Sequence, residues 1–262
     1  MRASRVVAVV NQKGGVGKTT TAISLGATLA AYENPTLLVD IDPQSNCSSG
    51  IGMEPGTDGL TTYELLTGAA DLSAAAQPTE FPHLSIVPAT PQLAGAEVEL
   101  VGMVGREFRL RDALEERQIE PYQFVLIDCP PSLGLLTLNA LTAADGLIVP
   151  IQCEYFAMEG VSNLMVTVEE VRRYLNPELA IDGIVLTMYD ERTRLAQQVA
   201  DEVRNVFGDL VFSAVVPRNV RLAEAPSYGR PIHAYDLRSR GSQSYLELGR
   251  EYLARMEVER GR

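Results

Sequence analysis

Two lysines and three glycines are grouped in one short stretch near the start of the chain. The stretch reads Gln-Lys-Gly-Gly-Val-Gly-Lys-Thr-Thr over residues 12–20, and it follows the apolar run 6–10. A strand that leads into a glycine-rich turn and then a helix is typical of a phosphate-binding loop, in which backbone N–H groups and the helix N-terminus surround a phosphate. In such a loop Lys18 reaches the β- and γ-phosphates and Thr19 ligates Mg²⁺. The stretch therefore predicts a nucleotide site.

Lysine occurs nowhere else in the chain. Lys13 and Lys18 are the only two lysines, and the other twenty basic residues are arginine. The loop departs from the general pattern G-x-x-x-x-G-K-[ST], because Gln12 stands where that pattern has glycine and Lys13 is an addition. An ammonium acts as a point charge toward phosphate, whereas arginine imposes a planar fork. This bias favours a nucleotide role over a glycine turn with incidental lysines. GTP-specific relatives read the base with [NT]-K-x-D, and no lysine is left for that motif, so ATP is preferred.

Three aspartates stand at the ends of predicted strands. Asp40 ends the strand 36–40 and Asp42 follows it, while Asp128 ends the apolar strand 124–128. Ligands of open parallel sheets bind beyond the carboxyl ends of the strands, so we expect these acids to face the loop. Taken alone, Asp42 followed by proline is also ordinary turn chemistry. An acid at the position of Asp128 holds Mg²⁺, usually through water, in phosphate-loop enzymes.

These motifs, in this order, resemble the deviant Walker A ATPases, whose loop reads K-G-G-x-G-K-[ST] and which include ParA/Soj, MinD, ArsA and the nitrogenase iron protein. The segment 128–134 resembles D-C-P-P-S-L-G of ParA/Soj, and 217–229 resembles P-R-N-V-R-L-x-E-A-P-S-x-G of chromosomal ParA/Soj proteins. The resemblance covers nearly the whole chain. It implies a DNA-partitioning ATPase with ATP and Mg²⁺ as cofactors. It also implies an ATP sandwich homodimer that binds non-specific DNA, separates on hydrolysis, and is stimulated from weak basal activity by a ParB-like centromere-binding protein.

The resemblance also implies roles for single residues. Lys13 reaches across the dimer to the partner's nucleotide and acts in catalysis with Lys18 and Asp42, which positions or activates the attacking water. Asp40 and Asp128 support the magnesium shell. Arg192 and Arg221 correspond to family DNA contacts, and this interpretation is favoured over a solvated arginine face without a function. Arg218, Arg230, Arg238 and Arg240 could widen that patch. The ATP-binding set is Lys13, Gly14, Gly15, Val16, Gly17, Lys18, Thr19, Thr20, and, packed on the adenine, Pro217 and Asn219.

Composition limits the remaining possibilities. The formal charge is −12 and the pI is about 4.7, which argues against a surface that coats nucleic acid everywhere. Any DNA contact must come from a local arginine patch, doubled by dimerisation. Cys47, Cys129 and Cys153 lack metal-ligand spacing, so we expect reduced thiols and no iron–sulfur cluster. The sequence has no secretory segment and no apolar run long enough to span a membrane, so a cytoplasmic protein is expected. The DNA binding that the resemblance implies would make it nucleoid-associated.

The elements that must position these residues alternate between strand and helix. This order predicts a single α/β domain over 1–262, with a mostly parallel twisted sheet and helices on both faces. Further strands are expected at 84–88, 146–151, 181–189 and 210–216. Helices are expected at 21–32, at 91–117 as one long amphipathic helix, at 160–175 and from about 242. The segments 50–59 and 69–82 are expected to be loose.

Three alternatives stay open. A MinD-like membrane-cycling regulator is disfavoured, because the glutamates of the tail balance its arginines, whereas a membrane-targeting end is basic. A ParA-like ATPase that positions a division or chemotaxis complex has the same motifs, since cargo choice lies in partner surfaces. A metabolic phosphate-loop enzyme would need a substrate pocket or a metal–thiol cluster, and the sequence indicates neither.

Overall fold

One eight-stranded sheet forms the centre of the molecule. The computed structural model describes residues 4–53, 59–155 and 157–260. The strand order is β3-β4-β2-β5-β1-β6-β7-β8, and every neighbouring pair except β3 with β4 is parallel. This confirms the predicted α/β class with a mostly parallel sheet. The strands are β1 Arg5–Val9, β2 Thr36–Asp40, β3 Gln77–Pro78, β4 Leu84–Val87, β5 Phe124–Asp128, β6 Gly146–Gln152, β7 Ala180–Tyr189 and β8 Val211–Pro217.

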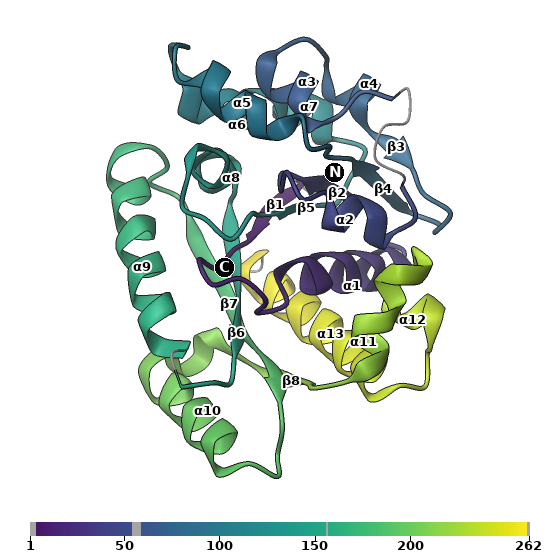
Figure 1. Cartoon of the computed structure of the whole chain (residues 1–262), viewed down its shortest axis with the longest axis vertical. Coiled ribbons are helices and arrows are strands. Elements are labelled where there is room, and N and C mark those ends of the chain that lie inside the picture. Colours follow the sequence, from purple (N-terminus) through teal and green to yellow (C-terminus); the bar gives the residue numbers. More distant parts are fainter. Residues whose placement is uncertain (1–3, 54–58, 156, 261–262) are drawn as a thin grey trace.

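Helices cover both faces of this sheet (Figure 1). The first face carries α3 Thr62–Thr67, α4 Leu72–Ala75, α5 Leu93–Leu100, η1 Arg106–Phe108, α6 Arg109–Ala113, α7 Glu116–Ile119, α8 Leu135–Ala143, α9 Ala157–Tyr174 and α10 Arg194–Phe207, with η2 Gly208–Leu210 after it. The second face carries α1 Lys18–Ala31, α2 Asn46–Gly50, α11 Val220–Glu224, η3 Ala225–Tyr228, α12 Ile232–Tyr235 and α13 Arg240–Arg260.

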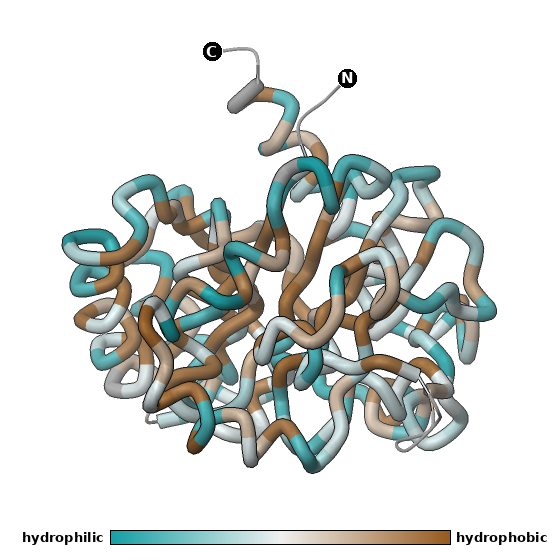
Figure 2. Tube along the Cα trace, turned by 90° about the horizontal axis from the view of Figure 1, so that it is seen from above, coloured by the Kyte–Doolittle hydropathy of each residue, from teal (hydrophilic) through white to brown (hydrophobic). Residues whose placement is uncertain are grey.

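Each face of the sheet has its own hydrophobic core. In β1, Val6 and Ala8 belong to the first core and Val7 to the second, because successive side chains of a strand point to opposite faces. Both faces are therefore buried, which explains why the central strands read as continuous apolar runs. Hydrophobic residues accordingly concentrate in the middle of the molecule and hydrophilic residues on its outside (Figure 2).

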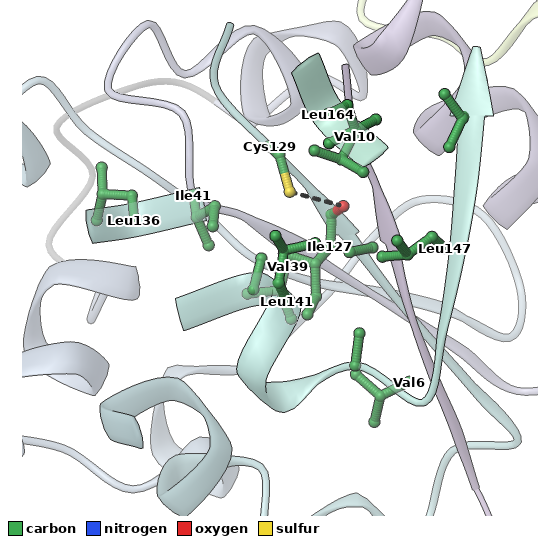
Figure 3. Close-up of a cluster of buried hydrophobic side chains, with 14 of the residues drawn as sticks. Val6, Val10, Val39, Ile41, Ile127, Cys129, Leu136, Leu141, Leu147 and Leu164 are labelled. Carbon is green, nitrogen blue, oxygen red and sulfur yellow. Dashed lines mark hydrogen bonds between the residues drawn. The ribbon is translucent and has the colours of Figure 1, made fainter. Parts of the chain in front are cut away.

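The first core reaches up to the acids at the strand ends. Figure 3 shows Val39 of β2 and Ile127 of β5 in this core, together with Cys129. The thiol of Cys129 is buried and lies 3.9 Å from the carbonyl oxygen of Ile127. Cys47 and Cys153 are also buried free thiols, as the sequence predicts. Burial raises the pKa of all three thiols, so they stay protonated and unreactive.

The prediction of one long helix at 91–117 is wrong. This stretch forms α5, η1, α6 and α7, four short pieces with turns between them. The break has two physical causes. Gly105 adopts a left-handed conformation with φ +68°, which a continuous helix does not allow. The side chain of Asn139 in α8 also accepts a hydrogen bond from the Leu110 N–H and donates one to the Arg106 carbonyl, so it stabilises the new helix start.

The segments expected to be loose are partly ordered. The stretch 69–82 contains α4 and the edge strand β3, and 50–53 continues from α2, whereas 54–58 lie outside the described residues. The expected tail helix is α13. It packs on β8 and α1 and buries Tyr245, Leu248, Tyr252 and Met256.

Candidate functional site

The glycine-rich loop lies between β1 and α1, at the carboxyl end of the central strand. Gly15 and Gly17 adopt left-handed conformations with φ +74° and +89°, which side chains other than glycine resist. Gly17 is also the N-cap of α1, so Lys18 is the first residue of that helix. A chain that turns sharply and then starts a helix directs its free N–H groups into the space before the helix, where an anion is stabilised.

Asn11 anchors this loop, and the sequence reasoning missed it. Its side-chain amide donates to the Pro150 carbonyl in β6 at 2.7 Å, and its side-chain oxygen accepts the Lys13 N–H at 2.9 Å. The hydroxyl of Thr187 in β7 donates to the Val16 carbonyl at 2.8 Å. The loop is therefore attached to two further strands, and only a long-range view of the sheet reveals these contacts.

Lys18 and the three predicted aspartates meet beside the loop. Lys18 is buried, and its ammonium donates to the Lys13 carbonyl at 3.1 Å. Burial lowers the pKa of Lys18, while Asp128 and Asp42 oppose that change. β2 and β5 are paired with Asp40 opposite Asp128, so parallel register brings the two strand-end acids together. The sheet thus assembles the cluster that the sequence predicts.

The three acids differ in what they bind. Asp40 accepts hydrogen bonds from both the N–H and the hydroxyl of Ser48, at 2.9 and 2.7 Å, and from the Asp42 N–H at 3.1 Å. Burial raises the pKa of Asp40 to about 6. Asp40 therefore holds α2 and the Asp42 turn in place. Asp42 is buried, and its carboxylate accepts only the Gln44 N–H among the residues described.

Asp128 is a buried carboxylate whose oxygens accept no hydrogen bond of normal geometry within the described chain, although the Thr19 hydroxyl lies close enough to act on its charge. Burial and the neighbouring Asp40 raise its pKa, and the nearby Thr19 and Lys18 oppose the rise. An unpartnered buried acid costs stability unless a ligand satisfies it. A hydrated Mg²⁺ bound by the Thr19 hydroxyl would fit beside Asp128, because magnesium keeps several of its water ligands and takes few ligands from the protein. No group of three or more His, Cys, Asp or Glu side chains in the described ranges could hold a metal ion by itself.

Replacing Asp128 by asparagine is expected to stabilise the nucleotide-free chain at alkaline pH. The unfolded chain loses this proton at a lower pH than the folded chain, so the acid lowers stability as pH rises toward its raised pKa. The advantage of asparagine should be absent below about pH 4 and reach at least about 3 °C in melting temperature near pH 9. Thermal melts in EDTA across this range check it. A variant that melts below the parent chain near pH 9 would contradict the unpartnered state of Asp128.

A pocket of about 370 Å³ adjoins the loop. Pro217 and Asn219, which the resemblance assigns to adenine, lie in its wall beside Gly17 and Thr20. The side chain of Asn219 also accepts the Arg221 N–H at 2.8 Å and caps α11. The resemblance assigns no role in this pocket to the other lining residues, which come from β7, from β8 and the segment after it, and from α13: Thr187, Met188, Val216, Arg218, Val220, Leu222, Ala223 and Tyr245.

A second hollow, which we call the arginine groove, has a volume of about 870 Å³ and contains Arg192, Arg218, Arg238 and Arg240. Its acids are Asp190, Glu191 and Glu247, from the end of β7 and from α13. Arg221 of α11 is not among its lining residues. The groove thus brings Arg192 and Arg218 together, and it joins the 370 Å³ pocket at Pro217 and Arg218.

Four of the predicted patch arginines are paired with carboxylates. Arg192 makes two hydrogen bonds to Asp190, at 2.9 and 2.7 Å. This partner lowers the pKa of Asp190 to about 2, so its charge persists at physiological pH. The other pairs are Arg218 with Glu154, Arg240 with Glu191, and Arg221 with Glu224 and Asp236. In the sequence only Glu224 and Asp236 lie among the arginines of 217–240, and the fold brings Glu154 and Glu191 to two of these arginines from other loops, which offsets part of the local positive charge.

Known proteins are similar in sequence to this chain over nearly its whole length. A family model described as an AAA domain, AAA_31, matches residues 4–181. The chromosome partitioning protein ParA of Caulobacter vibrioides is 56% identical over 252 residues, covering 96% of this chain and 94% of the relative. The sporulation initiation inhibitor protein Soj of Bacillus subtilis is 52% identical, covering 95% and 98%. The chromosome-partitioning ATPase Soj of Treponema pallidum is also 52% identical, covering 96% and 98%.

Solved structures agree with this relationship. A Mycobacterium smegmatis protein named cobyrinic acid a,c-diamide synthase, with bound ADP and magnesium, is 38% identical with a TM-score of 0.85, covering 99% of this chain and 97% of that one. The cell division ATPase MinD of Pyrococcus furiosus is 23% identical with a TM-score of 0.79, covering 96% and 99%, and shares the fold. With its lysine loop, strand-end acids and relatives above half identity, the chain belongs to the ParA/Soj family of chromosome-partitioning ATPases, which act on ATP with Mg²⁺.

Proposed function

We propose that this ATPase partitions DNA by closing an ATP-dependent homodimer that grips DNA without sequence preference and releases it on hydrolysis. The observation that carries the proposal is the arrangement at one edge of the sheet. The lysine loop, the 370 Å³ pocket and the arginine groove adjoin one another there, and Arg218 lines both hollows. A change in the bound nucleotide therefore takes place next to the arginines that are proposed to bind DNA.

We assign hydrolysis to charged and polar groups that the fold places around the phosphates and the attacking water. Lys18 at the start of α1 and the loop N–H groups would neutralise the phosphates, and Thr19 and Asp128 would hold a hydrated Mg²⁺, which would supply further charge stabilisation. Asp42 is placed by its bond to the Gln44 N–H and holds the attacking water. Asp40 keeps the Asp42 turn attached to α2. Pro217 and Asn219 hold the adenine in the pocket beside Gly17.

Lys13 is the residue proposed to join two subunits. Its side chain is 34% exposed, whereas Lys18 is buried in the loop. The two lysines therefore point to different places, although they share one turn. An ammonium at the surface next to a phosphate site is suited to contact the triphosphate of a facing copy. This assignment makes ATP, with its γ-phosphate, a better link between subunits than ADP.

DNA binding by an acidic chain needs an explanation, since four of the patch arginines have carboxylate partners: Arg192, Arg218, Arg221 and Arg240. The phosphates of DNA replace these carboxylates as partners of the arginines. Exposed ion pairs contribute little stability, so each change of partner alters the free energy only slightly. Release of counterions from DNA then supplies the net gain, and it doubles when two subunits act together. Weak binding by one subunit and firm binding by two is the expected result.

Arg221→Glu is expected to weaken DNA binding by the ATP-bound dimer by about tenfold or more and to leave basal hydrolysis unchanged. Each dimer loses two phosphate contacts, so the slope of log affinity against log salt should fall by about two. Fluorescence anisotropy with a labelled duplex over a salt series measures both quantities.

Arg173→Glu is the matched control, because it makes the same charge change at an exposed position of α9, a helix that carries none of the patch arginines. It should lower affinity by much less than Arg221→Glu. Equal losses in the two variants would mean that net charge alone acts. A parallel loss of hydrolysis in Arg221→Glu would mean that the arginine supports the fold of α11 and does not contact DNA.

The alternatives are weighed on the tail and on the relatives. α13 uses its apolar face against β8 and α1, which leaves no such face for a MinD-like membrane anchor in 240–258. No helix among the described residues is long and apolar enough to span a bilayer. A metabolic role is suggested by the name of the M. smegmatis structure, but relatives above half identity carry partitioning names.

A ParB-like centromere-binding protein is the proposed stimulating partner, and a nucleoid-associated location in the cytoplasm follows from DNA binding. A ParA-like role with another cargo remains the second candidate, because the catalytic edge would be the same. Stimulation of hydrolysis by a purified ParB-like protein, compared with candidate division or chemotaxis partners, distinguishes the two.

A further inference from the structure

Glu154 lies between the two functional surfaces and binds a cation from each. It follows β6, and its carboxylate is 3.5 Å from the Lys13 ammonium and 3.6 Å from the Arg218 guanidinium. The side-chain amide of Gln152 donates to the Arg218-facing oxygen of the same carboxylate. No role for Glu154 follows from the motifs, because its neighbours come from the loop after β1 and the end of β8.

The surroundings fix where Lys13 can go. Its N–H is bound by Asn11 and its carbonyl by Lys18, so the backbone on both sides is held. Asn11 is itself attached to β6 through the Pro150 carbonyl. On the α9 side, a Cβ at Gly160 would lie 3.9 Å from the Lys13 Cβ. Only the outer part of the Lys13 side chain is therefore free to move, and Glu154 holds that part against its own subunit.

We propose that Glu154 is a positioning residue that retains the Lys13 ammonium in the single subunit and yields it to the partner's triphosphate when two subunits close. This inference rests on the proposed ATP dimer. A triphosphate carries more negative charge than one carboxylate and accepts several charge-assisted hydrogen bonds, so Lys13 exchanges toward it. Arg218 stays beside Glu154 after the exchange, and the carboxylate is not left unpaired.

The retention acts as a threshold for dimer formation. The side chains of Lys13 and Glu154 are 34% and 45% exposed, so water and salt screen their attraction. An exposed pair of this kind shifts an equilibrium by a factor of about five at most. The contact therefore leaves the ATP dimer accessible while disfavouring closure when the partner site holds no γ-phosphate.

Glu154→Gln tests this directly. The glutamine side chain has the size of glutamate and keeps an oxygen that can accept the hydrogen bond from Gln152. It has no negative charge to attract Lys13. Each dimer breaks two retained pairs, one in each subunit, so in saturating ATP and Mg²⁺ without DNA sedimentation velocity should show dimers forming at a protein concentration about two- to twenty-fivefold lower than in the parent chain. Glu154→Asp, which keeps the charge, should restore the parent midpoint. The gain should vanish in about 1 M salt, where screening removes the retained pair.

Glu191→Gln is the control for net charge, because Glu191 pairs with Arg240 at 3.8 Å in the arginine groove. It removes one negative charge from the same edge and should leave the midpoint unchanged. A parent chain that stays monomeric in ATP would defeat the proposed dimer itself. A parent chain that dimerises, with Glu154→Gln equal to it, weaker than it, or matched by Glu191→Gln, would overturn the role of Glu154 alone.

Discussion

Asp42→Ala is expected to lower the rate of ATP hydrolysis by about a hundredfold or more while ATP stays bound. The carboxylate is buried at the end of β2, next to the loop, and the Gln44 N–H is its partner in the described chain. Removing it takes away the group proposed to hold the attacking water, but no group proposed to hold phosphate. The ATP-bound dimer should therefore accumulate and remain on DNA.

Single-turnover hydrolysis and nucleotide binding, measured side by side, separate these effects. Asp42→Asn is the matched variant, because its side-chain oxygen can still accept the Gln44 N–H and preserve the turn. It should lose hydrolysis as severely as the alanine variant. Unchanged turnover in both variants would remove Asp42 from the mechanism, and loss of ATP binding in both would show that the aspartate only supports the loop.

Lys13→Ala should weaken ATP-dependent dimer formation by about a hundredfold or more and leave ATP binding by the single subunit measurable. Each dimer loses two charge-assisted contacts, one in each direction, because the same lysine acts from both subunits. Lys18→Ala, in contrast, should abolish ATP binding, since Lys18 is buried within its own loop. Light scattering reports the dimer and calorimetry reports ATP binding.

The comparison of the two lysine variants is informative in each direction. An intact ATP dimer in Lys13→Ala would refute the contact across the interface. Loss of ATP binding in that variant would mean that Lys13 serves its own nucleotide, as Lys18 does. The exposed position of Lys13 and the buried position of Lys18 predict two different defects.

The place of the two strand-end acids could be predicted from their position along the chain. Asp40 and Asp128 each end an apolar strand, and a parallel sheet must bring such ends to one edge, where the loop after β1 also lies. The fold class followed from the same alternation of strand and helix. These inferences need only local pattern and one rule about parallel sheets.

The contacts that sequence reasoning missed depend on which loops the fold brings together. Asn11 shows a local signal only in its place beside the loop, and its bond to Pro150 requires β6 as the neighbour of β1. The pairing of Arg218 with Glu154 joins residues from two different strand ends. The prediction of one helix at 91–117 was wrong for a related reason, because Asn139 from a separate helix stabilises the break at Leu110. Tertiary contacts decided each case.

Retention of DNA by the parent chain in ATP and in ADP tests the central claim most directly. Co-sedimentation with a non-specific duplex, over a series of protein concentrations at fixed salt, should show DNA in the pellet with ATP and Mg²⁺ and very little with ADP. The dependence on protein concentration should be steeper than linear, because two arginine patches must act together. Equal retention with ATP, with ADP and without nucleotide would contradict the account, since DNA binding would then be independent of the closure that the lysines are proposed to control.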